Sequence, residues 1–266
     1  KNGYQAKVLT ITAKEKLCLC EEMECNPVNC PYAKGHYDRV NDAVFSLLQK
    51  EDMITREVIL EQAKEYNVCP FEMCLDTATW VDDIICDYNY VFDPNVYLKR
   101  FFADGTTGDY IFLVDEAHNL VERSREMYSA IIYKEDFLLA KKILKKYGQA
   151  KLMRELEKCN RVLLSYKREC EKYVIYESIG NFAFELMNVA SDLDEFLQKA
   201  PEFPERKDLS EFYLNLRNFL NIYELLDDHY VVYAEHEQDG RFKLKLYCVD
   251  PSKNLQERIN LSLIHI

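Results

Sequence analysis

Glycine, proline and tryptophan are scarce in this chain of 266 residues, which holds seven glycines, seven prolines and one tryptophan. Glycine and proline interrupt regular structure, so their scarcity favours helices. No apolar run is long enough to span a bilayer, and no basic start followed by an apolar stretch marks a secretory leader. Hydrophobic residues make up 48% of the chain, enough for a sizeable core. We therefore expect a helix-rich, cytoplasmic protein that does not enter membranes.

Positive charge is also in short supply, because 34 basic residues face 46 acidic ones and the formal net charge is -12. At first sight this balance argues against nucleic-acid binding. Residues 1–50 nevertheless carry seven basic and six acidic side chains, so the acidity lies mostly in the remainder. The total therefore does not exclude a DNA path near the start of the chain.

The strand and helix patterns change along the chain. Residues 7–12 are β-rich, and residues 18–75 hold six of the ten cysteines between prolines and two short helices predicted at 42–49 and 57–66. A short strand is expected within 81–92. Residues 110–114 form a run of five apolar residues, which is typical of a strand buried on both faces.

Long helices are predicted downstream of this run. Apolar side chains recur at helical spacing in three stripes, namely Leu152, Leu156, Cys159, Leu163, Tyr166, Cys170 and Tyr173; Leu186, Val189, Leu193 and Leu197; and Leu209, Phe212, Leu216, Phe219 and Tyr223. These stripes predict a bundle of antiparallel helices with solvated charged faces. Residues 230–249 predict a hairpin that turns at Asp239-Gly240. The order of elements indicates an α/β domain interrupted by two insertions.

The apolar run at 110–114 leads directly into Asp115-Glu116-Ala117-His118. In a nucleotide hydrolase, a strand of this kind carries its first carboxylate to the sheet edge, where Asp115 would hold Mg²⁺. Glu116 would then act as the general base, and His118 would sense the nucleotide. The alternative interpretation is that an acidic residue simply caps the following helix. No G-x-x-x-x-G-K-[ST] phosphate loop occurs in the sequence, so we expect no ATP hydrolysis from this chain alone.

The clustered cysteines predict a metal site. Cys18, Cys25, Cys30 and Cys69 are widely spaced, whereas structural zinc sites usually use C-x₂-C pairs, which this chain lacks. Iron–sulfur clusters also take four thiolates and tolerate varied loops, so spacing favours them slightly. Cys20 and Cys74 lie nearby as alternative ligands. The other four cysteines fall within strand or helix patterns and are expected in the core; they are Cys86, Cys159, Cys170 and Cys248.

The two signals together resemble the XPD/DinG group of superfamily 2 helicases, in particular its bacterial members. The matching stretches are ITAKEKLC at 11–18, CNPVNCPYAKGHYDRVNDA at 25–43, CPFE at 69–72, ICDYNYVFDP at 85–94, FLVDEAHNL at 112–120 and KLYCVDPSKNL at 245–255. The resemblance implies a RecA-like motor domain interrupted by an iron–sulfur module and a mostly helical arch.

The resemblance also implies roles for particular residues. It assigns a 4Fe-4S cluster to Cys18, Cys25, Cys30 and Cys69, and Mg-ATP chemistry to the acidic box. It further implies ATP-driven 5′-to-3′ movement on single-stranded DNA by a monomer. The chain departs from the family in lacking a complete ATP site. The phosphate loop is therefore expected before Lys1 and the second motor domain after Asn260.

The domain boundaries follow from this interpretation: 1–17 motor domain, 18–75 iron–sulfur module, 76–120 motor strands with the acidic box, 121–229 helical arch, 230–260 hairpin and return to the motor, and 261–266 a non-native tail. Candidate DNA contacts surround the cysteines; they are Lys14, Lys16, Lys34 and Arg39 for phosphates, and Tyr32, Tyr37, Tyr88 and Tyr90 for base stacking. The alternative interpretation is that each of these is only a surface charge or a core aromatic.

Two other functions compete with the helicase. One is a zinc-stapled interaction module without catalysis, which would be colourless where an iron–sulfur protein is brown. The other is a nuclease related to DinG-like proteins, although the sequence shows no separate set of exonuclease carboxylates.

Overall fold

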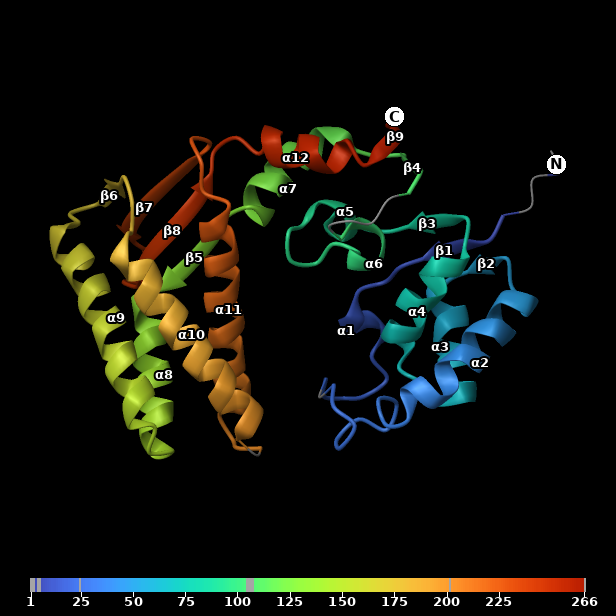
Figure 1. Ribbon diagram of the computed structural model, residues 1–266, viewed down its shortest axis with the longest axis horizontal. Helices are drawn as coiled ribbons and strands as arrows, with labels where there is room; N and C mark the ends of the chain where they lie inside the picture. Colours follow the sequence, from blue (N-terminus) through green and yellow to red (C-terminus); the bar gives the residue numbers. More distant parts are fainter. Residues whose placement is uncertain (1–2, 4–5, 24, 104–107, 201, 266) are drawn as a thin grey trace. The chain divides into compact units, whose positions relative to one another are not determined.

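The computed structural model describes residues 3, 6–23, 25–103, 108–200 and 202–265 (Figure 1). The chain divides into two compact units. Unit 1 comprises Lys1–Val91 and Leu98–Thr106, and unit 2 comprises Phe92–Tyr97 and Thr107–Ile266. The cysteine-rich stretch lies in unit 1 and the acidic box lies in unit 2, so the two parts are considered separately.

Unit 1 is built on a small parallel sheet. Strand β1 (Val8–Thr10) lies between β2 (Met53–Ile54) and β3 (Asp83–Ile85), and both neighbours run parallel to it. The strands expected within 7–12 and 81–92 are therefore confirmed. The helices of this unit are α1 (Lys14–Leu17), α2 (His36–Lys50), α3 (Arg56–Tyr66), α4 (Pro70–Thr77), η1 (Ala78–Trp80) and α6 (Lys99–Phe102), while α5 (Asn89–Phe92) crosses the unit boundary.

Helices α2 and α3 confirm the two helices that were predicted by periodicity. The buried residues of α2 recur at helical spacing; they are Val40, Ala43, Val44 and Leu47. Gly35 precedes this helix with a φ of 67°, a left-handed conformation that glycine adopts without strain. Asn67 directly follows α3 and also takes the left-handed conformation, with a φ of 52°. The side-chain amide of buried Gln62 donates to the Ala43 carbonyl and ties the two helices together.

Unit 2 contains a four-stranded antiparallel sheet in the order β5-β8-β7-β6. Its strands are β5 (Ala130–Tyr133), β6 (Tyr173–Tyr176), β7 (Tyr230–His236) and β8 (Phe242–Cys248). The predicted hairpin is confirmed as β7 and β8. Strand β8 alternates strictly, burying one face composed of Phe242, Leu244, Leu246 and Cys248.

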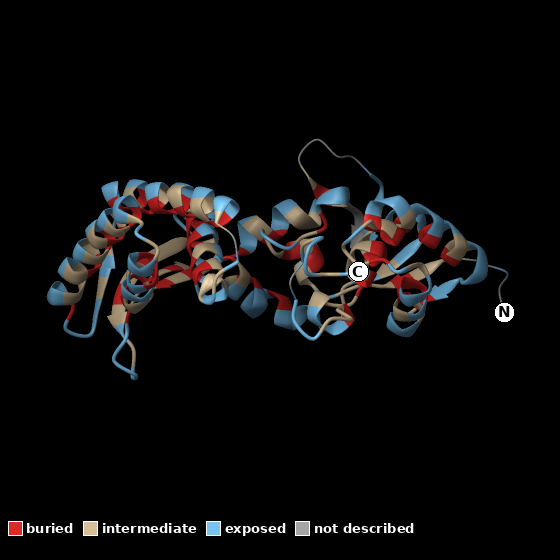
Figure 2. Cartoon of the chain, turned by 90° about the horizontal axis from the view of Figure 1, so that it is seen from below, coloured by how far each residue is buried: buried red, intermediate tan, exposed pale blue. Residues whose placement is uncertain are grey.

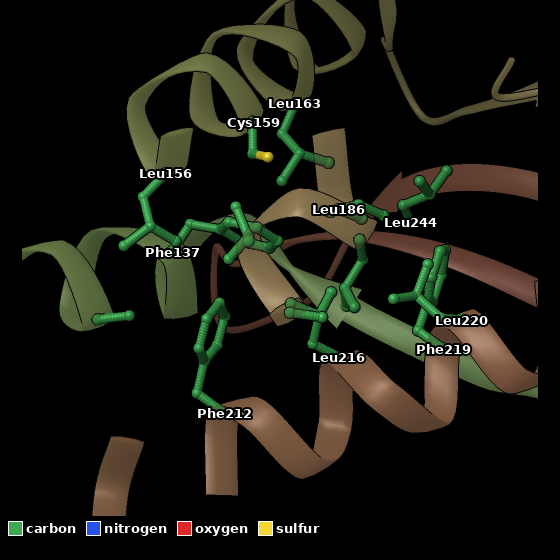
Figure 3. Packing of buried hydrophobic residues seen from close by; sticks show 14 of the residues in the cluster. Phe137, Leu156, Cys159, Leu163, Leu186, Phe212, Leu216, Phe219, Leu220 and Leu244 are labelled. Atoms are coloured by element: carbon green, nitrogen blue, oxygen red, sulfur yellow. The ribbon is translucent and has the colours of Figure 1, made fainter. Parts of the chain in front are cut away.

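Four long helices pack with this sheet. They are α8 (Lys134–Lys146), α9 (Ala150–Glu169), α10 (Asn181–Lys199) and α11 (Arg206–Glu224). Their inward residues merge with the sheet into one apolar cluster (Figure 3). Within it, the rings of Phe137 and Phe212 meet edge to face, with 5.1 Å between their centroids. The alternation of buried and exposed positions along the helices is visible in Figure 2.

The three predicted stripes are confirmed with one correction. The stripe on α9 is buried from Leu152 to Leu163 and continues to buried Cys170, but Tyr173 is 65% exposed because it lies in β6, beyond the helix. The expectation of a bundle of helices alone is incomplete, because β5 and β6 extend the hairpin to four strands. The broader prediction of an α/β fold with parallel strands is confirmed.

The strand before the acidic box differs from its prediction. Strand β4 covers only Tyr110–Phe112 and pairs in parallel with one strand, β9 (Ser262–His265). Ile111 and Leu113 are 60% and 74% exposed. The expected burial on both faces is therefore wrong, since within the described part of unit 2 β4 pairs with β9 alone and keeps these side chains exposed. The predicted tail at 261–266 supplies β9, while Ile266 lies outside the described residues.

Two further helices complete unit 2. Helix α7 (Leu120–Met127) follows the short turn η2 (Ala117–Asn119), and α12 (Ser252–Ile259) leads into β9. In the described part of the chain, no helix combines the length and the apolar character that crossing a membrane requires.

Candidate functional site

The acidic box lies just beyond β4, fully on the surface. Asp115, Glu116 and His118 are all exposed, and Glu116 takes a left-handed conformation with a φ of 50°. The Glu116 backbone N–H donates to Asp115 Oδ1 at 2.9 Å. His118 Nδ1 lies 3.3 Å from Glu116 Oε2. The three side chains therefore form one local group.

This geometry tests the alternative interpretation, in which an acidic residue of the box only caps the helix that follows. Glu116 is the residue before η2, yet its side chain makes no capping hydrogen bond. A capping role would require a carboxylate oxygen to accept from an N–H of the following turn. The Glu116 carboxylate is instead exposed beside His118, where it can accept a proton or orient water. Asp115 offers carboxylate oxygen of the kind that Mg²⁺ prefers, together with substrate phosphates and water.

Five cysteines gather at one end of unit 1. Cys18 follows α1, Cys20, Cys25 and Cys30 lie in the loop before α2, and Cys69 directly precedes α4. Cys20 Sγ and Cys30 Sγ are 3.8 Å apart, and Cys18 also hydrogen-bonds to Cys20. Of the predicted ligands, the structure thus places Cys18 and Cys30 in contact with Cys20, which was considered only as an alternative.

Cys69 is the residue immediately before the first turn of α4. Burial raises the pKa of the Cys69 thiol, and the backbone N–H groups of Phe71 and Glu72 at the start of α4 offset only part of that rise. The Cys69 N–H donates to Nδ1 of His36 at 3.2 Å. His36 is buried, and burial lowers the pKa of its imidazole. Sequence reasoning missed His36, since only the fold brings it beside Cys69.

Titration of the group reflects its crowded sulfur atoms. Burial and, after it, the hydrogen bond with Cys30 together raise the pKa of Cys20 to about 11. Burial also raises the pKa of Cys69. Burial by itself would lower the pKa of Lys14, but the hydrogen bond and the charge interaction with Cys25 raise it overall. The raised pKa values of Cys20 and Cys69 favour their neutral thiols, and a bound metal ion would drive deprotonation of both.

The remaining cysteines lie apart from this group. Cys74 is fully buried, and burial raises the pKa of its thiol to about 12. Burial likewise raises the pKa of Cys86 to about 11, although Cys86 is only partly buried. The other three are buried in the core of unit 2, as predicted; they are Cys159, Cys170 and Cys248. Cys74 therefore lies in the core of unit 1, and its role as an alternative ligand stays a prediction.

As arranged, the thiols do not yet surround a single ion. Among residues 3, 6–23, 25–103, 108–200 and 202–265, no three His, Cys, Asp or Glu side chains are placed to hold one metal ion. The donor chemistry of the five thiols nevertheless suits a soft metal.

The candidate DNA contacts occupy varied environments. Tyr37 is 83% exposed, whereas Tyr90 is only 8% exposed. The Arg39 guanidinium donates to the backbone carbonyls of Lys34, Tyr66 and Asn67, so it ties the start of α2 to the end of α3. Lys14 is engaged with Cys25 and lies over the Phe71 ring. A role in DNA binding stays a prediction for all of them.

Comparison with known proteins supports one family. The DEAD_2 family model matches residues 4–138. A curated protein from Anopheles gambiae, described as regulator of telomere elongation helicase 1 homolog, is 26% identical over 128 residues, which cover 47% of this chain and 12% of that protein. The chain thus spans about an eighth of the length of this relative.

Solved structures share the fold. A structure described as XPD_Helicase matches all of this chain and 45% of its own length, at a TM-score of 0.52 and 20% identity. A second structure, described as truncated XPD, matches 98% of this chain and 72% of its own length, at a TM-score of 0.51 and 18% identity. Since the family model alone covers more than half of the residues, this chain belongs to the DEAD_2 family.

Proposed function

We propose that this chain is part of an ATP-dependent DNA helicase of the XPD/DinG type that moves 5′ to 3′ on single-stranded DNA. The observation that carries the proposal is that one DEAD_2 chain contains both an exposed Asp-Glu box and a group of cysteine thiols. The box directly follows a strand that pairs in parallel. The relative from Anopheles gambiae is described as a helicase homolog, which supports the same activity.

In this proposal, Asp115 and Glu116 supply the carboxylates of a Mg-ATP site. Asp115 holds Mg²⁺ through water, and Glu116 accepts a proton from the attacking water. His118, 3.3 Å from Glu116, reports the nucleotide state to neighbouring motifs. The phosphate loop and the second motor domain come from other parts of the full protein, so the chain alone is inactive.

The proposed cofactor is a 4Fe-4S cluster on Cys18, Cys25, Cys30 and Cys69. The choice of a cluster over zinc rests on the resemblance to the XPD/DinG group, together with the slight preference that the cysteine spacing gives. The cluster's role is structural, fixing the module that separates the DNA strands. A zinc module remains the alternative that the metal content decides.

The remaining features follow from the resemblance to bacterial members of the group. We expect a monomeric, cytoplasmic enzyme whose single-stranded DNA passes near the cysteine module. The partners at that path are Lys14, Lys34, Arg39, Tyr37 and Tyr90. Tyr37 is more exposed than Tyr90 and is therefore the better candidate for base stacking.

The test is Glu116→Gln in the full-length protein. Glutamine preserves shape but cannot accept the proton, so DNA-stimulated ATP hydrolysis should fall by a factor of about 100 or more, while DNA binding is kept. The matched control is Glu122→Gln, which changes an exposed carboxylate on α7. Retained hydrolysis in Glu116→Gln would exclude this residue as the base. Purified protein that contains zinc, no iron and no ATPase would instead support the interaction module.

A further inference from the structure

Helix α9 carries a one-sided row of positive charge. Its exposed face presents five basic side chains at spacings that place them along one side of the helix: Lys151, Arg154, Lys158, Arg161 and Arg168. We call these five residues the basic ridge. At 1.5 Å per residue, the ridge extends over about 26 Å. From the sequence alone, such a charged face is expected to be merely solvated.

The surroundings strengthen the positive charge of the ridge. Residues 141–168 hold ten Lys or Arg and two Asp or Glu, in a chain whose net charge is -12. One of the two acids, Glu157, is already engaged, because Lys141 Nζ lies 2.5 Å and Arg161 Nε 3.5 Å from its carboxylate. This concentration of positive charge is therefore local to α8 and α9, and its sign is opposite to the net charge of the chain.

The flank toward α10 is partly neutralised. Lys151 lies 2.5 Å from Asp192, and Lys158 lies 3.7 Å from Glu185. In the part of the chain that the structure describes, Arg154 and Arg168 form no ion pair. With Arg161, these two arginines recur every seven residues, which sets them about 10.5 Å apart along the helix.

A hollow on the surface lies between α8 and the basic ridge of α9. It has a volume of about 530 Å³ and is lined by Lys141, Ala150, Met153, Arg154, Glu157, Lys158 and Arg161. Neither the hollow nor the ridge presents an aromatic side chain, so neither offers a platform on which unpaired bases could stack. Long cationic side chains at regular intervals instead suit the phosphates of a rigid partner.

We propose that the basic ridge of α9 binds the phosphate backbone of double-stranded nucleic acid. A ridge of about 26 Å matches roughly seven to eight base pairs of duplex, at 3.4 Å per pair. Recognition is through charge, so the ridge holds a duplex without reading its sequence. The inference rests on the charge pattern of α9 and does not depend on the proposed ATPase.

The experiment measures binding of a fluorescent 20-base-pair DNA duplex to the 266-residue chain over a series of salt concentrations. The variant is the triple substitution Arg154→Gln, Arg161→Gln and Arg168→Gln. Each lost phosphate contact should reduce the slope of log affinity against log salt by about 0.9, hence by nearly 3 in total. Affinity at low salt should fall at least tenfold.

The control removes the same number of charges elsewhere in unit 2. Lys199, Lys207 and Arg217 are exposed cations on or beside α10 and α11, and their replacement by Gln should change the slope by less than 1. Circular dichroism checks that both triple variants are folded. Equal losses in the two variants would overturn the proposal, because net charge alone would then explain binding. Binding of polyglutamate that is as tight as duplex, and equally lost in the ridge variant, would also overturn it in favour of an acidic protein partner.

Discussion

The two units of this chain hold their loops in place by different means. Unit 2 joins four helices to a four-stranded sheet through one apolar cluster. In unit 1, residues 18–35 form a stretch without helix or strand among its described residues, and Met23 and Val28 are 53% and 90% exposed. A stretch of this length without regular structure is uncommon in a compact domain unless it has a function or another anchor. In the proposed function, the thiolate ligands of the cluster would hold this loop in place, as apolar burial holds the helices and strands of unit 2.

Removing one thiol from the cysteine group should have the largest effect on this comparison. In the anaerobically purified 266-residue chain, Cys30→Ser should abolish bound iron and the brown visible absorption, since hydroxyl is a poor ligand for iron. Hydrogen exchange across residues 18–35 should rise with that loss, while exchange in α9 and α11 stays unchanged. Iron content, absorption spectra and hydrogen exchange measure these outcomes.

The controls for this prediction are Cys74→Ala and Cys20→Ala. Cys74 is buried away from the group, so its variant should keep the iron. Cys20 contacts Cys30 but lies outside the proposed ligand set, so its variant should keep the iron as well. Iron retained in Cys30→Ser and lost in Cys20→Ala would transfer the ligand role to Cys20.

A substitution that creates a cavity in the apolar cluster tests how far apolar burial stabilises unit 2. Leu163 is fully buried on α9, and Leu163→Ala should lower the free energy of unfolding of unit 2 by roughly 3 kcal/mol. Leu214→Ala makes the same substitution on α11 at a side chain that is 64% exposed, and should cost less than about 0.5 kcal/mol. Urea unfolding followed by hydrogen exchange separates the units. An equal loss of stability in α2 and α3 would show that the two units unfold together.

The smallest effect concerns a surface group at the entry to the hairpin. Asp227 accepts from Lys253 and from the backbone N–H of His229, and these contacts, the Lys253 hydrogen bond first, lower its pKa to about 2. The usual value is about 3.9, so the folded state prefers the ionised carboxylate. Its stabilisation is fully present above about pH 4 and is lost as the pH falls towards 2.

Asp227→Asn should therefore flatten part of the acid dependence of stability, by less than about 1 kcal/mol because the pair is near the surface. Urea unfolding at intervals between pH 2 and 6 measures the difference from the unmodified chain. Asp228→Asn, at the exposed neighbouring residue, is the control. The same pH profile in both variants would exclude a specific role for Asp227.

Local patterns in the sequence predicted much of the fold. The stripe on α9 and the alternation in β8 were found because each depends on side chains a few residues apart. Strands β5 and β6 were not predicted, since four residues carry too little alternation to be distinguished from a loop. They form because the β7–β8 hairpin offers free edges to pair with.

The sequence by itself determined the thiols, the acidic box and the helical periods, because these are properties of residue type and spacing. Only the tertiary structure decided that Cys20 joins the sulfur group and that Cys74 does not, since burial and contact depend on how α1 and α4 pack. It likewise decided that β4 is exposed, because the burial of a strand is set by its neighbours and not by its own apolar residues. The basic residues of α9 can be read from the sequence, but they lie together on one exposed face only because this segment folds as a helix.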